Sequence, residues 1–373
     1  MIAKDWTNMT NGVWISPLLP KLQPPHQPAE KHGAVGSGPR FKFDLLSYLR
    51  AYNTVRNVCS SLVDDLAKYD FSTVRGALIA SVPGKHDVEQ EPEMTRWGWQ
   101  GLKETLKGVP VQAGTPDIVA QVSSIATLGA SDTWLQRTLF DSLSASRPPS
   151  QQDQPISFRT KVPRPNFKIV FPTPDEIRQS IDGYASGASI HTKIQSAAQA
   201  KQLQYLRPLF HHWTNNNAGP SASSVSASSP VSGDGSPSHR DAGRGPAAPH
   251  IKTYIRYSAK SIDWALLTSA NISKQAWGEA INKAGEVRIA SWEIGVLVWP
   301  ELLAGDADAK MVGTFKTDEP EGDDGARGRN SPLVGLRIPY DLPLLKYESS
   351  KLPWVATMRY KQPDWMGQVW PGY

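Results

Sequence analysis

The sequence predicts an α/β fold in which helices pack against a mostly buried sheet. Short runs rich in Val, Ile, Leu and Trp recur along the chain, and segments with helical spacing of apolar residues lie between them. With 373 residues the chain is long enough for a large core and, by length, for about two to three domains. An α/β sandwich accounts for this alternation.

Residues 1–74 form a first segment with few strand signals. Gly12–Ile15 has the composition of a strand, and residues 24–38 are rich in Pro and Gly, which predicts a loop. Apolar residues then recur at helical spacing over Phe41–Tyr52 and Val55–Tyr69.

From Arg75 onward, strand-like and helix-like segments alternate. The apolar runs predict strands over Ala77–Val82, Ile118–Ser123, Lys168–Phe171, Thr253–Tyr257, Ala265–Thr268 and Gly295–Trp299. Helical spacing predicts helices over Thr133–Leu143, Pro174–Gly183 and Ala200–Trp213.

Two segments have compositions typical of disordered insertions. Residues 215–244 are rich in Ser, Gly, Ala and Pro, and residues 318–329 form a charged loop containing Gly. Such segments bury too little apolar surface to offset the entropy lost on ordering. We expect both to be surface insertions, the first of which ends just before His250.

The strongest chemical signal is His250-Ile251-Lys252. In an extended chain His250 and Lys252 point to one face, because side chains alternate with a period of two. The later segment Thr268–Ser273 follows a buried strand, and Asn271 or Ser273 caps a short helix that starts near Lys274. An imidazole, an ammonium, an amide and a helix start suit a phosphodiester. The competing interpretation is that an isolated H-x-K pattern arises by chance and the Asn is only a cap.

A second H-x-K pattern occurs at His191-Thr192-Lys193. It lies among Ser and Gln, without flanking strand signals and without a following Thr-Ser-x-Asn segment. We therefore interpret it as unrelated to the site.

Composition excludes several classes of protein. The single cysteine, Cys59, excludes an internal disulfide framework and most cysteine-based metal sites. No apolar run approaches the roughly 20 residues of a membrane-spanning helix, and no secretory signal begins the chain. Forty Lys plus Arg against 35 Asp plus Glu give a net charge of +5, which is compatible with nucleic-acid binding without proving it.

Longer motifs resemble one family. His250-Ile-Lys-Thr-Tyr254, Leu267-Thr-Ser-Ala-Asn-Ile-Ser-Lys-Gln-Ala-Trp-Gly278, Ser291-Trp-Glu-Ile-Gly-Val-Leu297 and Pro339-Tyr-Asp-Leu-Pro343 are similar to the second half of the tyrosyl-DNA phosphodiesterases, members of the phospholipase D superfamily. The likeness extends back through Phe41–Leu49 and Gln121–Gly129. It implies an α-β-α sandwich with a complete second lobe over residues 75–373 and a remnant of the first lobe over residues 1–74.

The resemblance also implies catalytic roles. His250 matches the general acid that protonates the departing tyrosine and later activates water, Lys252 a charge-stabilising lysine, and Asn271 an amide that orients the phosphate. Glu293 matches a carboxylate that orients an active-site histidine. The family uses no metal and no cofactor. Asn11 stands where the first half of the family has Gln.

A further set of residues matches positions that contact DNA in the family. For Ser123, Ser124 and Thr127 the alternative is a hydrogen-bonded turn, and for Ser189 it is a helix cap. His211 and His212 are interpreted as capping residues at the end of a helix rather than as ligands.

The family builds its site from two halves, each with an H-x-K and a later Asn. Asn271 precedes Trp277 by six positions, and the same spacing from Trp6 falls one residue before Met1. We therefore expect the first H-x-K, which carries the nucleophilic His, to lie upstream of this chain.

Two classes of function remain open. The first is a nuclear, monomeric DNA-repair hydrolase that removes topoisomerase I-derived tyrosyl peptides from DNA 3′ ends, with exonuclease-like action on 3′ adducts. The second is a half-enzyme that binds DNA without turnover, since the first motif is missing. Neither involves a membrane.

Overall fold

The computed structural model describes residues 8–23, 33–91, 93–147, 163–215, 239–244, 246–259, 261–320 and 331–372. The expected helix around Trp6 and most of both expected insertions lie outside these residues. The α-helices are α1 (Gly38–Arg56), α2 (Ser60–Ala67), α3 (Gly98–Lys107), α4 (Phe140–Leu143), α5 (Pro174–Arg178), α6 (Ala197–Leu206), α7 (Lys274–Trp277) and α8 (Pro300–Ala304). A π-helix, η1 (Leu135–Leu139), and the 3₁₀ helices η3 (Gly183–Ser189) and η4 (Arg207–Leu209) complete the helical elements of the described part.

The strands form one large mixed sheet and one small hairpin-like pair. The strands are β1 (Ala77–Ser81), β2 (Gly84–Asp87), β3 (Asp117–Gln121), β4 (Asn166–Val170), β5 (Phe210–His211), β6 (Thr253–Tyr257), β7 (Ile262–Thr268), β8 (Glu286–Ile289), β9 (Glu293–Val298), β10 (Lys310–Thr314) and β11 (Leu333–Arg337). The large sheet runs β1-β9-β7-β6-β3-β4-β5, and β10, paired with β11, joins it through β7. Pairing is antiparallel from β1 to β3 and parallel across β3, β4 and β5.

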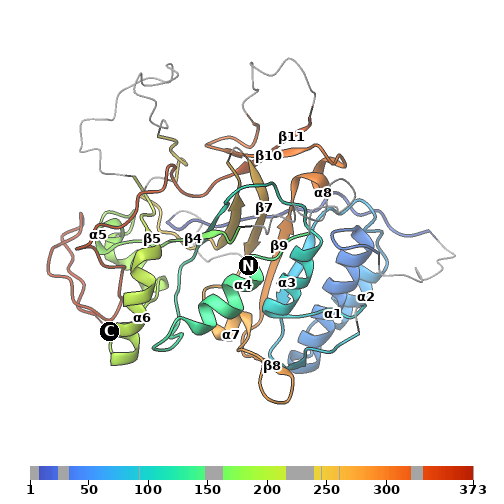
Figure 1. Cartoon of the computed structure of the whole chain (residues 1–373), viewed down its shortest axis with the longest axis horizontal. Helices are drawn as coiled ribbons and strands as arrows, with labels where there is room; N and C mark the ends of the chain where they lie inside the picture. Colours follow the sequence, from blue (N-terminus) through green and yellow to red (C-terminus); the bar gives the residue numbers. More distant parts are fainter. Residues whose placement is uncertain are drawn as a thin grey trace, which may run out of the picture.

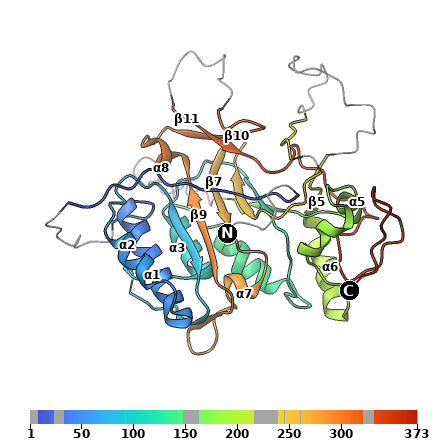
Figure 2. The same ribbon diagram turned by 180° about the vertical axis from the view of Figure 1, so that it is seen from behind.

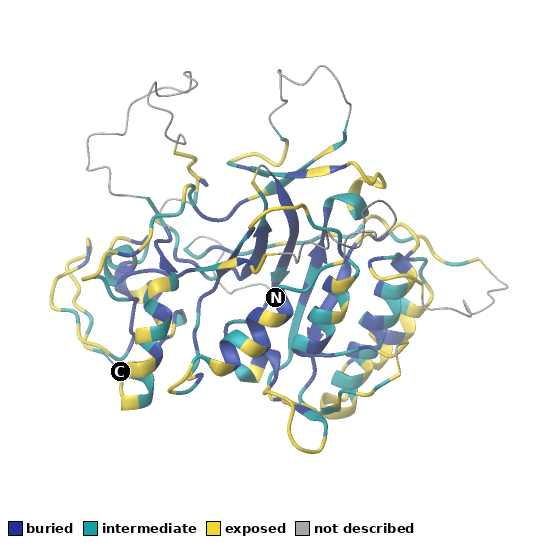
Figure 3. Ribbon diagram, viewed as in Figure 1, coloured by how far each residue is buried: buried dark blue, intermediate teal, exposed yellow. Residues whose placement is uncertain are grey.

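Helices cover one face of this sheet in a continuous layer. Leu102 of α3, Phe140 of α4 and Trp277 of α7 pack on inward residues of the strands such as Tyr254 and Leu266. Figure 1 shows α3, α4 and α7 in front of the strands, and Figure 3 shows buried strands with helices exposed on their outer sides. The central strands are buried along nearly their whole length, as expected for a sheet that is covered on both faces.

The opposite face is covered by segments from both ends of the chain. At the β1 edge, Phe41 and Tyr48 of α1 pack against Leu78 and Ala80. In the centre, chain that follows β11, including Tyr340, covers Ile255 and its neighbours. The dark-blue segment of residues 8–23 crosses this face in Figure 2.

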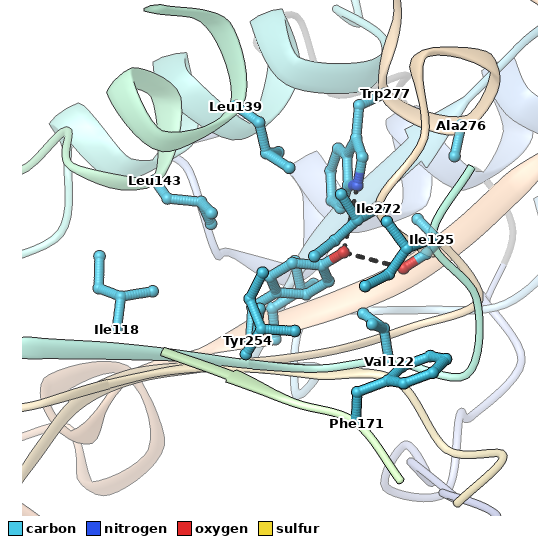
Figure 4. Packing of buried hydrophobic residues seen from close by; sticks show 14 of the residues in the cluster. Ile118, Val122, Ile125, Leu139, Leu143, Phe171, Tyr254, Ile272, Ala276 and Trp277 are labelled. Atoms are coloured by element: carbon cyan, nitrogen blue, oxygen red, sulfur yellow. Dashed lines mark hydrogen bonds between the residues drawn. The ribbon is translucent and has the colours of Figure 1, made fainter. Parts of the chain in front are cut away.

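Tyr254 connects the core to the loop after β7. Its side chain is fully buried and contacts Trp277 edge to face, with ring centroids 5.4 Å apart. The Trp277 indole N–H donates to the Tyr254 hydroxyl at 3.3 Å, and that hydroxyl donates to the Ala270 carbonyl at 3.2 Å (Figure 4). Buried polar groups must be paired, so this chain of bonds holds Ala270 in one place.

The six strands predicted from Arg75 onward are confirmed, with bounds that differ by up to three residues at an end. The strand predicted over Thr253–Tyr257 has the observed bounds of β6, whereas β7 begins at Ile262 rather than Ala265. The division at residue 74 stays a prediction, although α1 packs directly on β1.

The predicted strand at Gly12–Ile15 was wrong. Gly12–Ile15 pairs with no neighbouring strand among the described residues. The isolated bridges of this part of the chain lie on either side of it, from Met9 to Ala248 and from Lys21 to Tyr69. A strand requires a paired neighbour as well as a suitable composition.

Four predicted helices differ in detail. The helix predicted over Pro174–Gly183 ends at Arg178. The helix predicted over Ala200–Trp213 ends at Leu206, because Pro208 lacks an N–H and forces the chain out of the helix into η4 and β5. The helix over Thr133–Leu143 contains the wider π-helical turn of η1 before α4. The predicted helix over Val55–Tyr69 is interrupted at Asn57, which has a positive φ and ends α1.

Candidate active site

His250 and Lys252 lie side by side immediately before β6. Lys252 Nζ is 3.4 Å from His250 Nε2 and donates to the His250 carbonyl at 2.5 Å. An ammonium has no acceptor, so Nε2 accepts and the proton of the neutral imidazole is on Nδ1. The common face predicted for the two side chains is confirmed, although β6 itself begins one residue later.

Thr10 fixes the backbone of His250 from the far end of the chain. Its hydroxyl accepts from the His250 N–H at 3.1 Å and from the Ile251 N–H at 3.4 Å, and it donates to the Ala248 carbonyl at 3.2 Å. Sequence reasoning missed this residue, because an isolated Thr carries no local signal for a contact about 240 positions away.

Burial and positive neighbours keep His250 neutral. Burial, the Lys252 ammonium and His191 together lower the pKa of His250 to about 4. Burial also lowers the pKa of Lys252 to about 8, against the opposing attraction of Glu293. Near neutral pH the site therefore holds a neutral imidazole next to a cation.

Glu293 lies at the start of β9, close enough to Lys252 to interact with its charge. Burial raises the pKa of Glu293 to about 7, while the Ser269 hydroxyl and Lys252 lower it. Ser269 Oγ donates to Glu293 Oε2 at 2.6 Å and accepts from the Ile294 N–H at 3.0 Å. The expected bond from Glu293 to a histidine is replaced, among the described residues, by this bond from Ser269.

Asn271 is anchored by the loop after β3. Its Oδ1 accepts from the Ser123 N–H at 3.0 Å, from the Ser124 N–H at 2.9 Å and from the Ser123 hydroxyl at 3.3 Å. Backbone N–H groups are donors, so the amide orientation is fixed and its NH₂ group points away from them. Of the two predicted caps for α7, Ser273 is correct: its hydroxyl accepts from the Ala276 N–H at 3.0 Å.

These bonds change the roles expected for the Ser123–Thr127 loop. The N–H groups of Ser123 and Ser124 donate to Asn271, and Ser123 is 1% exposed, so Ser123 positions Asn271. The Thr127 hydroxyl is exposed and accepts from Gln199 Nε2 at 2.9 Å. Ser189 is half-buried and is the last residue of η3.

The three remaining histidines of interest lie in unexpected places. His191 pairs with Ser124 in a parallel bridge and contributes to the lowered pKa of His250, a proximity that the sequence did not predict. His211 lies in β5 and its Nδ1 is 2.8 Å from the Leu209 carbonyl, and His212 lies between Glu176 and Glu348. The predicted capping role fits His211, whose ring bonds the carbonyl at the end of η4, but was wrong for His212, which contacts two glutamates instead.

A cavity opens beside His250 and Lys252. It encloses about 320 Å³, and the side chains that line it are mainly apolar, among them Trp14, Phe41 and Val296. Asn11 also lines the cavity, with its Nδ2 donating to the Met9 carbonyl at 3.3 Å. The basic pair therefore meets an apolar hollow between α1 and the sheet.

The described residues lack two other kinds of feature. They contain no group of three His, Cys, Asp or Glu side chains arranged to hold a metal ion. They also contain no helix with the length and apolar character needed to cross a membrane.

The family model described as tyrosyl-DNA phosphodiesterase matches residues 1–348. The chain belongs to the tyrosyl-DNA phosphodiesterase family. A probable tyrosyl-DNA phosphodiesterase of Schizosaccharomyces pombe is 30% identical over 356 residues, which cover 90% of this chain and 57% of that protein. One from Caenorhabditis elegans is 30% identical over 350 residues, covering 90% and 61% of the two chains. The chain thus spans about three fifths of the length of these relatives.

The fold agrees with a solved structure of the family. The yeast tyrosyl-DNA phosphodiesterase superposes with a TM-score of 0.56 and 18% identity, covering 92% of this chain and 68% of that one. The predicted class, a phospholipase D-like α/β fold, is therefore confirmed.

Proposed function

We propose that this chain carries the acid/base half of a DNA-repair phosphodiesterase that hydrolyses 3′-phosphotyrosyl DNA through a phosphohistidine. The observation that carries the proposal is the contact of 3.4 Å between His250 Nε2 and Lys252 Nζ, in a member of this family. The substrates would be DNA 3′ ends bearing a topoisomerase I-derived peptide. Nuclear location, a monomeric state and exonuclease-like action on other 3′ adducts belong to the same proposal.

In the first step, a histidine nitrogen attacks phosphorus and the bond to the tyrosine oxygen breaks. His250 gives its proton to that oxygen, which leaves as neutral tyrosine. In the second step, His250 takes a proton from water, water oxygen bonds to phosphorus, and the phosphorus–nitrogen bond breaks. Lys252 and the NH₂ group of Asn271 stabilise charge on the phosphoryl oxygens.

The low pKa of His250 supports this sequence in a specific way. At a pKa of about 4 the imidazole is neutral in the free protein, as the water-activating step requires. For the first step it must be protonated, and a bound phosphate anion raises the pKa because it favours the imidazolium. Substrate binding thus favours the protonated form of His250, which is the acid of the first step.

The second candidate is a half-enzyme that binds DNA without turnover. Among the described residues, His250-x-Lys252 is the H-x-K motif that is followed by a Thr-Ser-x-Asn segment. No second histidine of the described residues is assigned as the nucleophile. With one catalytic histidine assigned and no partner for it, DNA binding without hydrolysis is the alternative function.

The test supplies the nucleophile from solution. The purified chain of 373 residues is mixed with a 5′-labelled oligonucleotide carrying 3′-phosphotyrosine, with and without imidazole, and products are separated on a denaturing gel. We expect imidazole-dependent release of tyrosine that is abolished in His250→Ala. Equal release by wild type and His250→Ala refutes the acid role, and binding with no release under any condition favours the half-enzyme.

A further inference from the structure

We propose that His191 and Lys193 form a second basic pair that binds a DNA phosphate adjacent to the one held at His250. The proposal rests on the proposed function and deepens it, because it assigns the residues that hold the next phosphate of the strand.

The segment that carries the pair is fixed alongside the Ser123–Ser124 loop. The His191 N–H donates to the Ser123 carbonyl at 3.0 Å, and the Ile125 N–H donates to the His191 carbonyl at 2.8 Å. This is the parallel bridge between Ser124 and His191. The position of His191 is therefore set by backbone bonds on both sides.

Exposure alternates along this segment. Thr192 is 6% exposed, whereas His191 and Lys193 are both exposed to solvent. In an extended segment, residues two apart project to the same side. The Lys193 ammonium and the His191 imidazole therefore lie on the outer side of the segment, and the Thr192 side chain is buried on its inner side.

The pair is close to the site through two independent links. The Ser124 N–H donates to Asn271 Oδ1 at 2.9 Å, so the residue bridged to His191 also anchors the phosphate-orienting amide. Electrostatic interaction with His191 lowers the pKa of His250, and electrostatic interaction with Lys193 lowers the pKa of His191. Lys193, His191, His250 and Lys252 thus form a row of basic groups.

Such a row lacks a compensating partner in the described part of the chain. Burial and Lys193, and no carboxylate, account for the lowered pKa of His191, and Lys193 has no ion pair there. Neighbouring Lys ammonium groups disfavour the protonated form of these histidines, and a bound anion favours it. DNA supplies a phosphate on every nucleotide, so a strand that enters at His250 brings its next phosphate to the pair.

The experiment measures binding rather than turnover. Fluorescence anisotropy gives the Kd of the chain of 373 residues for a single-stranded oligonucleotide with a 3′-phosphate, at several salt concentrations. The test variant is His191→Gln/Lys193→Gln. The matched control is Lys85→Gln/His86→Gln, which removes the same groups from β2 in the separate two-stranded sheet.

The test variant is expected to bind about 10-fold more weakly at low salt. Its slope of log K against log salt is expected to be shallower by about 0.7, the value for one single-strand phosphate contact. A neutral methylphosphonate is then placed in turn at each of the last linkages of the oligonucleotide. At one of these linkages it should lower the affinity of wild type for the oligonucleotide and leave the affinity of the variant unchanged. The control should behave as wild type.

An unchanged slope, or a variant that responds to every methylphosphonate as wild type does, overturns the proposal. It is also overturned if the variant loses affinity only for oligonucleotides with a 3′ peptide, because the pair then recognises the peptide. Turnover does not enter the readout, so failure of the hydrolase proposal leaves this result interpretable. Normal binding by the variant alongside weakened binding by His250→Ala refutes this inference alone.

Discussion

Three ionisable residues lie at the proposed site: Lys252 is buried, and His250 and Glu293 are half-buried. His250 is kept neutral, Lys252 is a cation that titrates near pH 8, and Glu293 titrates near pH 7. The sequence singled out all three, because each belongs to a motif of recognisable composition, and their catalytic roles stay predictions. It did not predict that Glu293 accepts from Ser269, since that contact depends on how β7 and β9 align.

The raised pKa of Glu293 predicts a specific pH dependence of stability. The folded state holds the proton up to about pH 7, whereas the unfolded chain releases it near pH 4.5, so this residue's contribution falls as pH rises between those values. The unfolding free energy of wild type minus that of Glu293→Gln should fall by on the order of 2 kcal/mol across this window. Urea unfolding of both proteins at pH 4.5, 5.5 and 7 measures this difference in unfolding free energy. His250 titrates in both proteins, so its contribution cancels in the difference. A difference that rises with pH contradicts the assigned environment.

Asn271 provides a pair of contrasting variants. Asn271→Ala leaves the Ser123 and Ser124 N–H groups without an acceptor and should lower the unfolding free energy by about 1–3 kcal/mol. Asn271→Asp keeps an acceptor there, so stability should stay near that of wild type while affinity for DNA falls, because a carboxylate repels phosphate. Urea unfolding and anisotropy report the two effects. An Asp variant that binds DNA as tightly as wild type would remove Asn271 from the phosphate site.

At the scale of elements, the groups of the site are carried by loops held against strands. Strand positions followed from apolar runs, because burial between two layers leaves a continuous apolar signal. The short pairs β2–β8 and β10–β11 were not predicted, since their exposed residues lack that signal. The bridge from Ser124 to His191 was also missed, because it joins two loops that no periodicity marks.

Tyr254 should couple the core to the loop that carries Asn271. Tyr254→Phe leaves the Trp277 N–H and the Ala270 carbonyl unpaired and should cost about 1–3 kcal/mol of unfolding free energy. It should also weaken DNA binding, because Ala270 adjoins Asn271. The matched variant is Tyr257→Phe, which makes the same change at a hydroxyl bonded to Tyr340 at 2.8 Å on the other face of β6. If the two variants weaken DNA binding equally, the proposed coupling is wrong.

At the scale of the whole molecule, the site depends on contacts between residues near the start of the chain and residues about 240 positions later. The segment of residues 8–23 crosses the sheet and braces His250 through Thr10, and α1 closes the cavity beside it. Sequence patterns are local, so they placed the elements and the motif residues but not this arrangement. The apolar lining of the cavity lowers the local polarity, which explains why the pKa of His250 falls so far.

The central claim is that a DNA phosphate binds between His250, Lys252 and Asn271, and histidine NMR tests it most directly. The pKa of His250 is measured in the chain of 373 residues, alone and with a saturating 3′-phosphorylated oligonucleotide, with His86 of β2 as the internal control. The predicted result is a pKa of about 4 in the free chain that rises on binding, while the pKa of His86 stays constant. A His250 pKa that is the same with and without bound DNA would contradict the claim.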